Sequence, residues 1–597
     1  STETDSKPDV VVTASRIEQP VAKTLASVTV IDRKAIERAQ VTTLPELLQR
    51  QAGIQYITNG SRGSNSSLFM RGTNGGHALV LVDGVRVGSA TLGTASLENY
   101  TLDQIDRIEI VRGPRSSLYG SEAIGGVIQI FTKKSGDPLR LSVAAGSKGT
   151  VDHSLSFAGA NERTRHSVTL SYEESQGFDS STQDNALADG QYNYDKDGYR
   201  NKGADLSFSH RLTDRLSVEG MYLNNRGKVE FDPGAYGPDS APFTDFDNTV
   251  ASLSANLDID LFEVKTQVSR ADDKNETNAS RSNFINTTKN QGLLQVGINN
   301  DTAGALVTGL EYVDELVDSS EVYTLTQRAV FSGFAQWQKD VNGIALQMGA
   351  RHDDNEQFGS KKTHNVGLGM PLGKNAQIYT TFGKAFKAPT FNDLYWPADS
   401  YSAGNPNLVP ETSSTGEIGT KWFGSAQTVD VSVYKTDVKH LIQWQPDENY
   451  FYSPTNLNKV KIKGIDASYG YAGKQWSVNS QLSLLSARDA ETDEKLIRRA
   501  GRTLTNNFDY DFSPFSVGAT WYVSGPRDDM GYDEMGNSYR IVLGGYSTLD
   551  LRAAYQATKE IKLKTSITNV FDKEYVLADG YNTAGLGGML TLLYVPK

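Results

Sequence analysis

The feature that most constrains this chain is an alternation of apolar and polar residues that recurs from about residue 135 to the end. Segments such as "HSVTLSY", "ASLSANLDIDL" and "QTVDVSVYK" place apolar side chains at every second position, and helical periodicity nearly vanishes. Successive side chains of a strand point to opposite faces, so each segment predicts a strand with one apolar face. Each segment has roughly the 8 to 12 residues that a tilted strand needs to cross a membrane.

A soluble sandwich or propeller also alternates in this way. Two features favour a transmembrane barrel. The polar alternates are often Ser, Thr, Gln, Asn or charged residues, which suit a hydrated lumen, and aromatic residues cluster near segment ends, as in "WYVSG", "YGYAG" and "LTLLYV". No run of about 18 apolar residues exists, but a barrel does not require one.

Composition excludes several classes of function. The chain has 597 residues with 59 basic and 71 acidic side chains, a net charge of −12, which argues against a nucleic-acid partner. The absence of cysteine excludes disulfides, thiolate metal sites and cysteine nucleophiles. The opening residues "STETDS" are not a charged-then-apolar leader, so we expect that a signal peptide has already been removed.

The first 134 residues are organised differently and predict a small α+β domain over residues 23–134, after a flexible segment over 1–22. Residues 28–39 indicate a strand followed by a short helix. The next helix begins with Thr43 and Glu46 at capping-box spacing, has Pro45 in its first turn and can end at Gly53. Glycine-bounded, strand-like runs follow in "HALVLVDGVRV", "IDRIEIVRG" and "GGVIQIFTK".

The chain resembles the TonB-dependent outer-membrane receptors. The resemblance rests on "NSSLFMRGTNGGHALVLVDGVRVG" and "IDRIEIVRGPRSSLYGSEAIGGVIQI" in the first domain, and on "GKAFKAPTFNDLY" and "ITNVFDKEYV" in the alternating region. It implies a transmembrane β-barrel of 22 antiparallel strands over residues 135–597, with the N-terminal α+β domain as a plug inside the lumen. It also implies a monomer in the outer membrane of a Gram-negative bacterium, in contact with lipid and lipopolysaccharide, whose loops phage or bacteriocins can use.

The stretch "DVVVTA" near the start is an extended, β-branched segment without a local partner. Such a segment can add as an edge strand to a partner sheet, or it can be the first strand of the plug. The outer membrane has no nucleotide pool, so work must arrive through a protein that crosses the periplasm. The resemblance implies a Ton box that binds the C-terminal domain of TonB, made of Asp9, Val10, Val11, Val12, Thr13 and Ala14.

Acidic residues gather in two predicted long loops, 173–203 and 227–247. "NYDKDG" resembles the first half of a calcium loop, but the twelfth position is Ala204, so an EF-hand is excluded. From the residues alone, a solvated acidic loop is the better explanation of the pattern, because loop acids are common. Resemblance to the cobalamin-transporting members of the family implies structural Ca²⁺ held by Asp179, Asn193, Asp195, Asp197, Asp232, Asp245 and the main chain at Phe231.

The same resemblance, carried by "VVVTASRIEQP", "LIRRA" and "YNTAG", implies that cobalamin or a related corrinoid is the transported ligand. Such a cargo is large, amide-fringed and nearly neutral, so its site should be polar. The implied contacts are Asn59, Ser64, Asn65, Ser66, Ser67, Asn74, Leu92, Gly93, Arg498 and Tyr532. Ser64, Asn65, Leu92 and Gly93 depart from the residues expected there.

Other functions fit the sequence less well. A ferric siderophore or another metal chelate stays open as cargo, whereas haem is disfavoured because the seven histidines are scattered. No G-x-S-x-G, H-E-x-x-H or Gly-rich phosphate loop is present, so we expect no enzyme. A passive porin would explain neither plug nor Ton box. We expect Arg71, Arg112 and Arg115 of the plug to pair with carboxylates of the barrel wall, and Tyr594 to be the terminal aromatic residue of the barrel.

Overall fold

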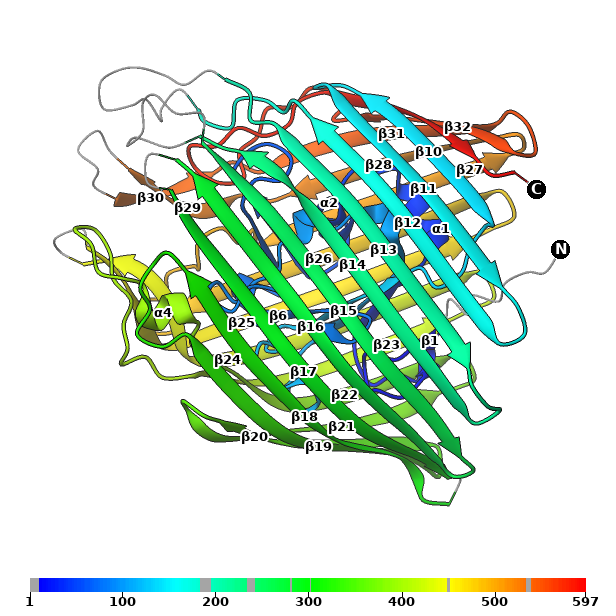
Figure 1. The fold of residues 1–597 in the computed structure, drawn as a ribbon, viewed down its shortest axis with the longest axis horizontal. Helices are drawn as coiled ribbons and strands as arrows, with labels where there is room; N and C mark the ends of the chain where they lie inside the picture. Colours follow the sequence, from blue (N-terminus) through cyan, green and yellow to red (C-terminus); the bar gives the residue numbers. More distant parts are fainter. Residues whose placement is uncertain are drawn as a thin grey trace.

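The computed structural model describes residues 10–182, 195–232, 242–279, 282–300, 302–447, 451–532 and 538–596. Two units make up this part of the chain, a closed β-barrel and an N-terminal domain inside it (Figure 1). The prediction of a 22-stranded antiparallel barrel filled by a plug is confirmed.

The barrel closes where its first strand pairs with its last, β10 with β33. Every neighbouring pair between them is antiparallel, and β29–β30 forms a separate two-stranded sheet. The barrel strands are β10 (Leu139–Gly146), β11 (Thr150–Ala160), β12 (Thr164–Ser175), β13 (Tyr199–Arg211), β14 (Leu216–Glu230), β15 (Phe243–Ile259), β16 (Phe262–Asn278), β17 (Asn283–Asn300), β18 (Gly304–Ser319), β19 (Gln327–Val341), β20 (Ile344–Asn355), β21 (Gly359–Leu372), β22 (Ala376–Lys387), β23 (Glu411–Phe423), β24 (Gln427–Pro446), β25 (Tyr452–Ala472), β26 (Trp476–Asp489), β27 (Arg502–Phe512), β28 (Phe515–Ser524), β31 (Tyr546–Gln556), β32 (Ile561–Thr568) and β33 (Gly587–Tyr594).

The barrel wall is apolar outside and polar inside, the reverse of a soluble protein. On β21, Val366 and Leu368 are exposed on the outer face, whereas Thr363 and Asn365 are buried against the lumen. A lipid-facing surface with a hydrated interior requires this alternation. The last strand ends at Tyr594, the aromatic residue predicted to close the barrel.

The two ends of the barrel differ in their connections. Short turns join strands at one end, as between Ile259 and Phe262, and the last barrel strand, β33, ends there (Figure 1). The other end carries the long connections, including the one that holds α4 (Phe391–Tyr395) and the one that holds β29 (Arg527–Tyr532) and β30 (Ser538–Leu543). Barrel proteins of the outer membrane place short turns in the periplasm and long loops outside the cell.

The plug is built on a five-stranded sheet of order β3-β8-β9-β6-β7, with β6 and β9 parallel. Among the described residues, no helix is both long enough and apolar enough to span a membrane. The elements are β1 (Val10–Val11), β2 (Gln19–Pro20), η1 (Val21–Lys23), β3 (Val28–Ile31), α1 (Arg33–Ala39), α2 (Leu44–Gln49), β4 (Ile54–Thr58), β5 (Ser66–Met70), η2 (Gly75–His77), β6 (Ala78–Val82), β7 (Val85–Arg86), η3 (Leu97–Asn99), η4 (Leu102–Gln104), β8 (Ile105–Arg112), α3 (Ser116–Tyr119) and β9 (Gly126–Thr132).

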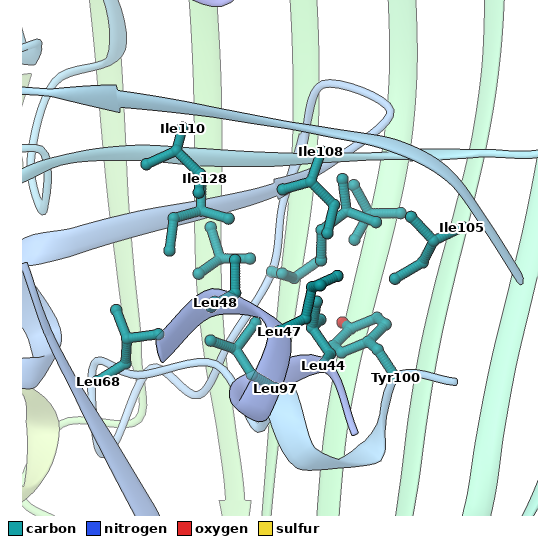
Figure 2. Close-up of a cluster of buried hydrophobic side chains, with 14 of the residues drawn as sticks. Leu44, Leu47, Leu48, Leu68, Leu97, Tyr100, Ile105, Ile108, Ile110 and Ile128 are labelled. Atoms are coloured by element: carbon teal, nitrogen blue, oxygen red, sulfur yellow. The ribbon is translucent and has the colours of Figure 1, made fainter. Parts of the chain in front are cut away.

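Helix α2 anchors the plug core. Thr43 caps it by accepting from the Glu46 amide, and Leu44, Leu47 and Leu48 are buried against the isoleucines of β8 and β9 (Figure 2). Barrel residues such as Met221 and Leu223 belong to the same cluster. The plug therefore shares its core with the wall, and truncating one of these leucines should cost about 2–5 kcal/mol.

Buried ion pairs join the plug to the wall, but not all the predicted ones. Arg71 donates to Glu417 at 2.5 Å and to Asp466 at 2.8 Å, as expected. No ion pair is recorded for the other two arginines within the described part of the chain. Arg112 donates to the plug carbonyl of Ala52 and to the Thr29 hydroxyl, and Arg115 donates to the carbonyl of Pro114. Both therefore hydrogen-bond within the plug, and the wall carboxylates Asp466 and Glu417 act on them at longer range.

Two expectations about extent also change. The loops predicted over 173–203 and 227–247 are shorter, because β12 continues to Ser175, β13 begins at Tyr199, β14 continues to Glu230 and β15 begins at Phe243. Where a strand extends beyond the membrane, its backbone hydrogen bonds to the neighbouring strands continue, but its outward positions are no longer apolar. Such a segment therefore resembles a loop in the sequence. The first barrel strand begins at Leu139, close to the predicted boundary at residue 135.

Candidate functional site

Three plug segments converge at the end of the barrel that carries the long connections. A Cβ built on Gly75 would lie 3.8 Å from Ser67 Cβ and 3.6 Å from Thr94 Cγ2. The first segment is a tight loop, in which the amide of Asn59 donates to the Asn65 carbonyl at 3.0 Å. The structure therefore brings the predicted contacts in segments 59–67, 74 and 92–93 onto one face of the plug.

The members of this face differ in how available they are. Leu92 is 61% exposed and Asn65 is exposed, so both are open to a ligand. Ser64 is 3% exposed, yet its hydroxyl has no hydrogen-bond partner among the described residues. Ser66 donates to the Glu98 carboxylate at 2.8 Å. Gly93 has a φ of 71° and lies against Thr390 of the wall, where a Cβ would come within 2.7 Å of Thr390 Cγ2.

The wall reaches this face through an arginine that the sequence did not single out. Arg499 donates to the Asn74 side chain at 2.6 Å and to the carbonyls of Gly72 and Thr73. Its guanidinium also lies over the Phe69 ring. Burial, with the adjacent charge of Arg498, lowers the pKa of Arg499 to about 9. The plug oxygens thus hold Arg499, which ties the plug to the loop between β26 and β27.

The two predicted barrel contacts lie in neighbouring connections. Arg498 donates to Asp529 of β29 at 2.9 Å and is about one third exposed. Tyr532 ends β29, in the hairpin β29–β30 that projects beyond the barrel.

Carboxylates gather beside this face. Oxygens of Asp195, Asp197 and Asp232 all lie within 4.8 Å of one another. Asp179 joins them, because the Ser181 amide donates both to Asp179, at 3.1 Å, and to Asp232, at 2.8 Å. Four of the predicted metal ligands therefore form one group, contributed by two loops.

The electrostatics of this group favour a cation. Burial and the charge of Asp232 raise the pKa of Asp179 to about 6. Burial, together with the charges of Asp232 and Asp195, raises the pKa of Asp197 to about 7, although a hydrogen bond from Ser180 opposes this shift. Crowded carboxylates repel one another, and a hard divalent cation with oxygen ligands would relieve the repulsion. The donor set thus fits Ca²⁺.

The remaining predicted metal ligands have different outcomes. Phe231 lies directly before Asp232 in the chain, and its amide donates to the Pro242 carbonyl at 3.1 Å. Asn193 lies outside the described residues. Asp245 is an exposed residue inside β15, opposite Lys228 and Glu276, and not in a loop. It stands on the outer face of the wall, since its neighbour Phe246 is buried.

The plug apex and the acidic loop are in direct contact. Ser61 donates to the Asp197 carbonyl at 2.5 Å, and its amide donates to the Ser180 hydroxyl at 3.1 Å. Gly60 has a φ of 135° and lies so close that a Cβ would be 2.2 Å from the Ser180 hydroxyl. The described part of the acidic loop and the plug apex are therefore held against each other.

The predicted Ton box lies at the opposite end of the plug. Asp9 is outside the described residues, and Val10–Val11 pairs with Gln19–Pro20. Val11, Thr13 and Ala14 are buried. The structure therefore shows this part of the predicted tether docked on the plug, not extended away from it.

One carboxylate holds the docked segment. Glu109 of β8 is fully buried and accepts from the amides of Val12, at 3.1 Å, and Thr13, at 2.9 Å. The Thr13 hydroxyl donates to the same oxygen at 2.6 Å, and Tyr119 donates to the Thr13 carbonyl at 3.0 Å. Arg107 pairs with Glu109 through its other oxygen. The backbone groups that a partner strand would need are thus engaged inside the plug.

Sequence reasoning missed Arg499, Ser180, Glu98 and Glu109. Burial raises the pKa of Glu98 to about 7, beneath Ser66. Each of these residues acts through a contact made over a long sequence separation, so no local pattern could identify it. "LIRRA" did carry a resemblance, and it contains both Arg498 and Arg499.

Comparisons with known proteins agree with this architecture. The family model "TonB dependent receptor-like, beta-barrel" matches residues 141–570, and "TonB-dependent Receptor Plug Domain" matches residues 20–127. The chain is 32% identical to "Vitamin B12 transporter BtuB" of Vibrio vulnificus, over 96% of this chain and 92% of that protein. It is 29% identical to the protein of the same name from Photobacterium profundum, over 96% of this chain and 93% of that protein.

Solved structures share the fold at lower identity. A mutant of the ferric enterobactin receptor PfeA from Pseudomonas aeruginosa superposes with a TM-score of 0.83 at 20% identity, covering 98% of this chain and 100% of that one. The siderophore receptor PirA from Acinetobacter baumannii gives a TM-score of 0.81 at 17% identity, covering 95% and 98%. At these identities the likeness is one of fold alone.

Proposed function

This chain belongs to the TonB-dependent receptor family, and we propose that its cargo is cobalamin or a related corrinoid. The family transports ligands across the outer membrane and is not one of enzymes. The observation that carries the cargo is the full-length similarity to two vitamin B12 transporters, at 32% and 29% identity.

The chemistry of the plug face supports this cargo. The available groups at its centre are hydroxyls, amides and the exposed Leu92. The nearest arginines are already engaged, Arg499 by plug oxygens and Arg498 by Asp529, and the ammonium of Lys387, which lies beside Gly76 and Gly93, belongs to a buried side chain. A nearly neutral ligand fringed with amides can exchange hydrogen bonds with such a surface. An anionic ferric chelate would instead favour free cations.

Calcium is the second part of the proposal. Asp179, Asp195, Asp197 and Asp232 would hold Ca²⁺, with Phe231 and Asn193 as further oxygen donors. The ion would neutralise the group and fix the loop after β12 against the plug apex through Ser61 and Ser180. Calcium would thereby pre-organise one wall of the cargo site, so its effect should appear in cargo affinity.

Energy coupling through residues 9–14 completes the proposal. Release of Val12 and Thr13 from Glu109 would free two amides for a partner sheet, to which the segment would add as a strand. The family requires TonB, and the C-terminal domain of TonB is the partner that this geometry fits.

The test is uptake by cells that lack their own cobalamin receptor. Cells that make this chain should accumulate labelled cobalamin when TonB is present and only bind it at the surface when TonB is absent. Accumulation of a ferric siderophore, but not of cobalamin, would keep the transporter and overturn the cargo. Cobalamin accumulation that is independent of TonB would overturn the coupling.

A further inference from the structure

Lysines line one stretch of the outer wall at every second position. "KVKIKG" places Lys459, Lys461 and Lys463 along β25, and Lys435 and Lys439 stand at corresponding positions on β24 (Figure 1). All except the half-buried Lys459 are exposed, while the residues between them, such as Val460 and Ile462, are buried. The lysines therefore point away from the barrel, and the lumen-facing chemistry of transport does not use them.

The ladder brings these charges together. Lys435 lies directly opposite Lys463, and Lys439 is opposite Lys459. Lys461 lies between Asp437 of β24 and Arg488 of β26, and Arg488 also pairs with Asp493. Like charges directly opposite each other destabilise a sheet. Among the described outward positions of these ladder rows, Asp437 is the one acid, and it pairs with Lys459 at 3.1 Å. The Lys435–Lys463 row contains no acid among its described positions, so this opposed pair costs stability unless an anion neutralises it.

An apolar groove of about 790 Å³ adjoins the lysines on the same face. Lys435 and Lys463 form its upper edge, and the next ladder row supplies Ile418, Val433, Ile465 and Leu484, all of which are exposed. Glycine creates part of the hollow, because a Cβ built on Gly416 would have nothing within 4 Å. The groove is thus open and not filled by the protein's own side chains.

The order of these features matches a lipid. From the apolar row, the cationic rows continue toward Lys387 and Glu411, where the long extracellular connection with α4 begins. An amphiphile in the outer leaflet would place its acyl chains in the groove and its anionic head group among the lysines. Lysines near anionic lipid contribute binding free energy individually, and buried acyl surface adds to it.

We propose that this face, made of Lys435, Lys439, Lys461, Lys463 and the groove at Gly416, is a binding site for a phosphorylated glycolipid of the outer leaflet. The site is independent of the cargo, because it lies outside the barrel. A bound lipid neutralises the opposed lysines and so stabilises strands β23 to β26, whose inner faces carry Glu417 and Asp466, the partners of Arg71.

The test is lipid binding to the purified full chain, counted by native mass spectrometry in detergent. The probe is lipid A with two phosphates, compared with dephosphorylated lipid A and with inorganic pyrophosphate. Lys435→Gln/Lys463→Gln removes two charges and keeps the stems. Its matched control is Lys362→Gln/Lys374→Gln, two exposed lysines outside these rows.

The groove is tested separately with Gly416→Phe, which adds a ring at a position where a Cβ meets nothing within 4 Å. Gly292→Phe is the control, because a Cβ there also has nothing within 4 Å. We expect lipid A to bind the lysine variant about 30-fold more weakly, at about fivefold per lysine, and Gly416→Phe also to weaken binding. Both controls should bind as the unaltered chain does.

Three results would overturn the proposal. The first is lipid A affinity within twofold of the unaltered chain in both test variants. The second is equal binding of dephosphorylated lipid A, which would show that phosphate is not recognised. The third is full competition by pyrophosphate with no effect of Gly416→Phe, which would indicate a bare anion site. The shift in electrophoretic mobility on heating reports whether each variant has folded.

Discussion

The most demanding prediction concerns the single carboxylate that docks the N-terminal segment. Glu109→Gln replaces a charged acceptor, on which the amides of Val12 and Thr13 and the Thr13 hydroxyl converge, with a neutral amide. Hydrogen bonds to charged groups contribute about 1.5–3 kcal/mol, and neutral ones about 0.5–1.5 kcal/mol. With the Tyr119 hydrogen bond retained, docking should weaken by about 2–3 kcal/mol, which raises the undocked fraction about 30- to 150-fold relative to the docked one.

The assay uses a nitroxide on Val12→Cys, which is a clean label because the chain has no cysteine. The mobile component of the spin-label spectrum should increase in Glu109→Gln and stay unchanged in Glu46→Gln, which alters a plug glutamate that bonds Arg50 and not this segment. If Glu109→Gln and the unaltered protein give the same mobile fraction, the carboxylate does not hold the segment and the docking argument fails.

Three further predictions follow from other contacts. The pKa values of Asp179 and Asp197 are raised, so protons compete with Ca²⁺ for these carboxylates as the pH falls through 7 and 6. Calcium affinity measured by calorimetry should therefore be about 20-fold weaker at pH 6 than at pH 8. Equal affinities at the two pH values would contradict this site. Arg71→Met leaves two buried carboxylates without their arginine and should lower the free energy of unfolding by about 3–5 kcal/mol, seen as a lower midpoint in denaturant. Arg115→Met should lower it less, because no ion pair of Arg115 is recorded in the described part of the chain. Equal losses of stability in the two variants would count against the pairing. Gly60→Ala forces a Cβ against Ser180, at a strain of about 1–3 kcal/mol. We expect this strain to weaken cobalamin binding about 10-fold or more in a titration. Unchanged binding would show that the contact between the plug apex and the acidic loop does not matter for the cargo.

The barrel could be predicted because its signal is local. Alternation with period two follows from strand geometry, and the exposed Val366 and buried Asn365 show the same rule in space. The number of strands came from family resemblance, since alternation does not mark where polar strands end. The loops before Tyr199 and Phe243 were overestimated for this reason, and Asp245 was therefore assigned to a loop.

The site was predictable only in part. The family resemblance implied four ligands that do meet, whereas the clustering of acids in two loops favoured, by itself, a solvated loop. Contacts between distant segments could not be inferred. Glu109, Arg112 and Arg115 belong to one sequence motif but have different roles. The two arginines donate to backbone carbonyls of the plug, whereas Glu109 holds the N-terminal segment. Motif residues show that a plug exists, whereas the partner of each side chain depends on tertiary packing.

The central claim, that calcium-ordered loops and the plug face together bind a corrinoid, is tested most directly by cobalamin binding to the purified, detergent-solubilised protein. The titration is made with calcium and repeated after a chelator has removed it. Tight binding that weakens on chelation is the predicted result. Binding indifferent to calcium would contradict the metal site, and no binding in either condition would contradict the cargo.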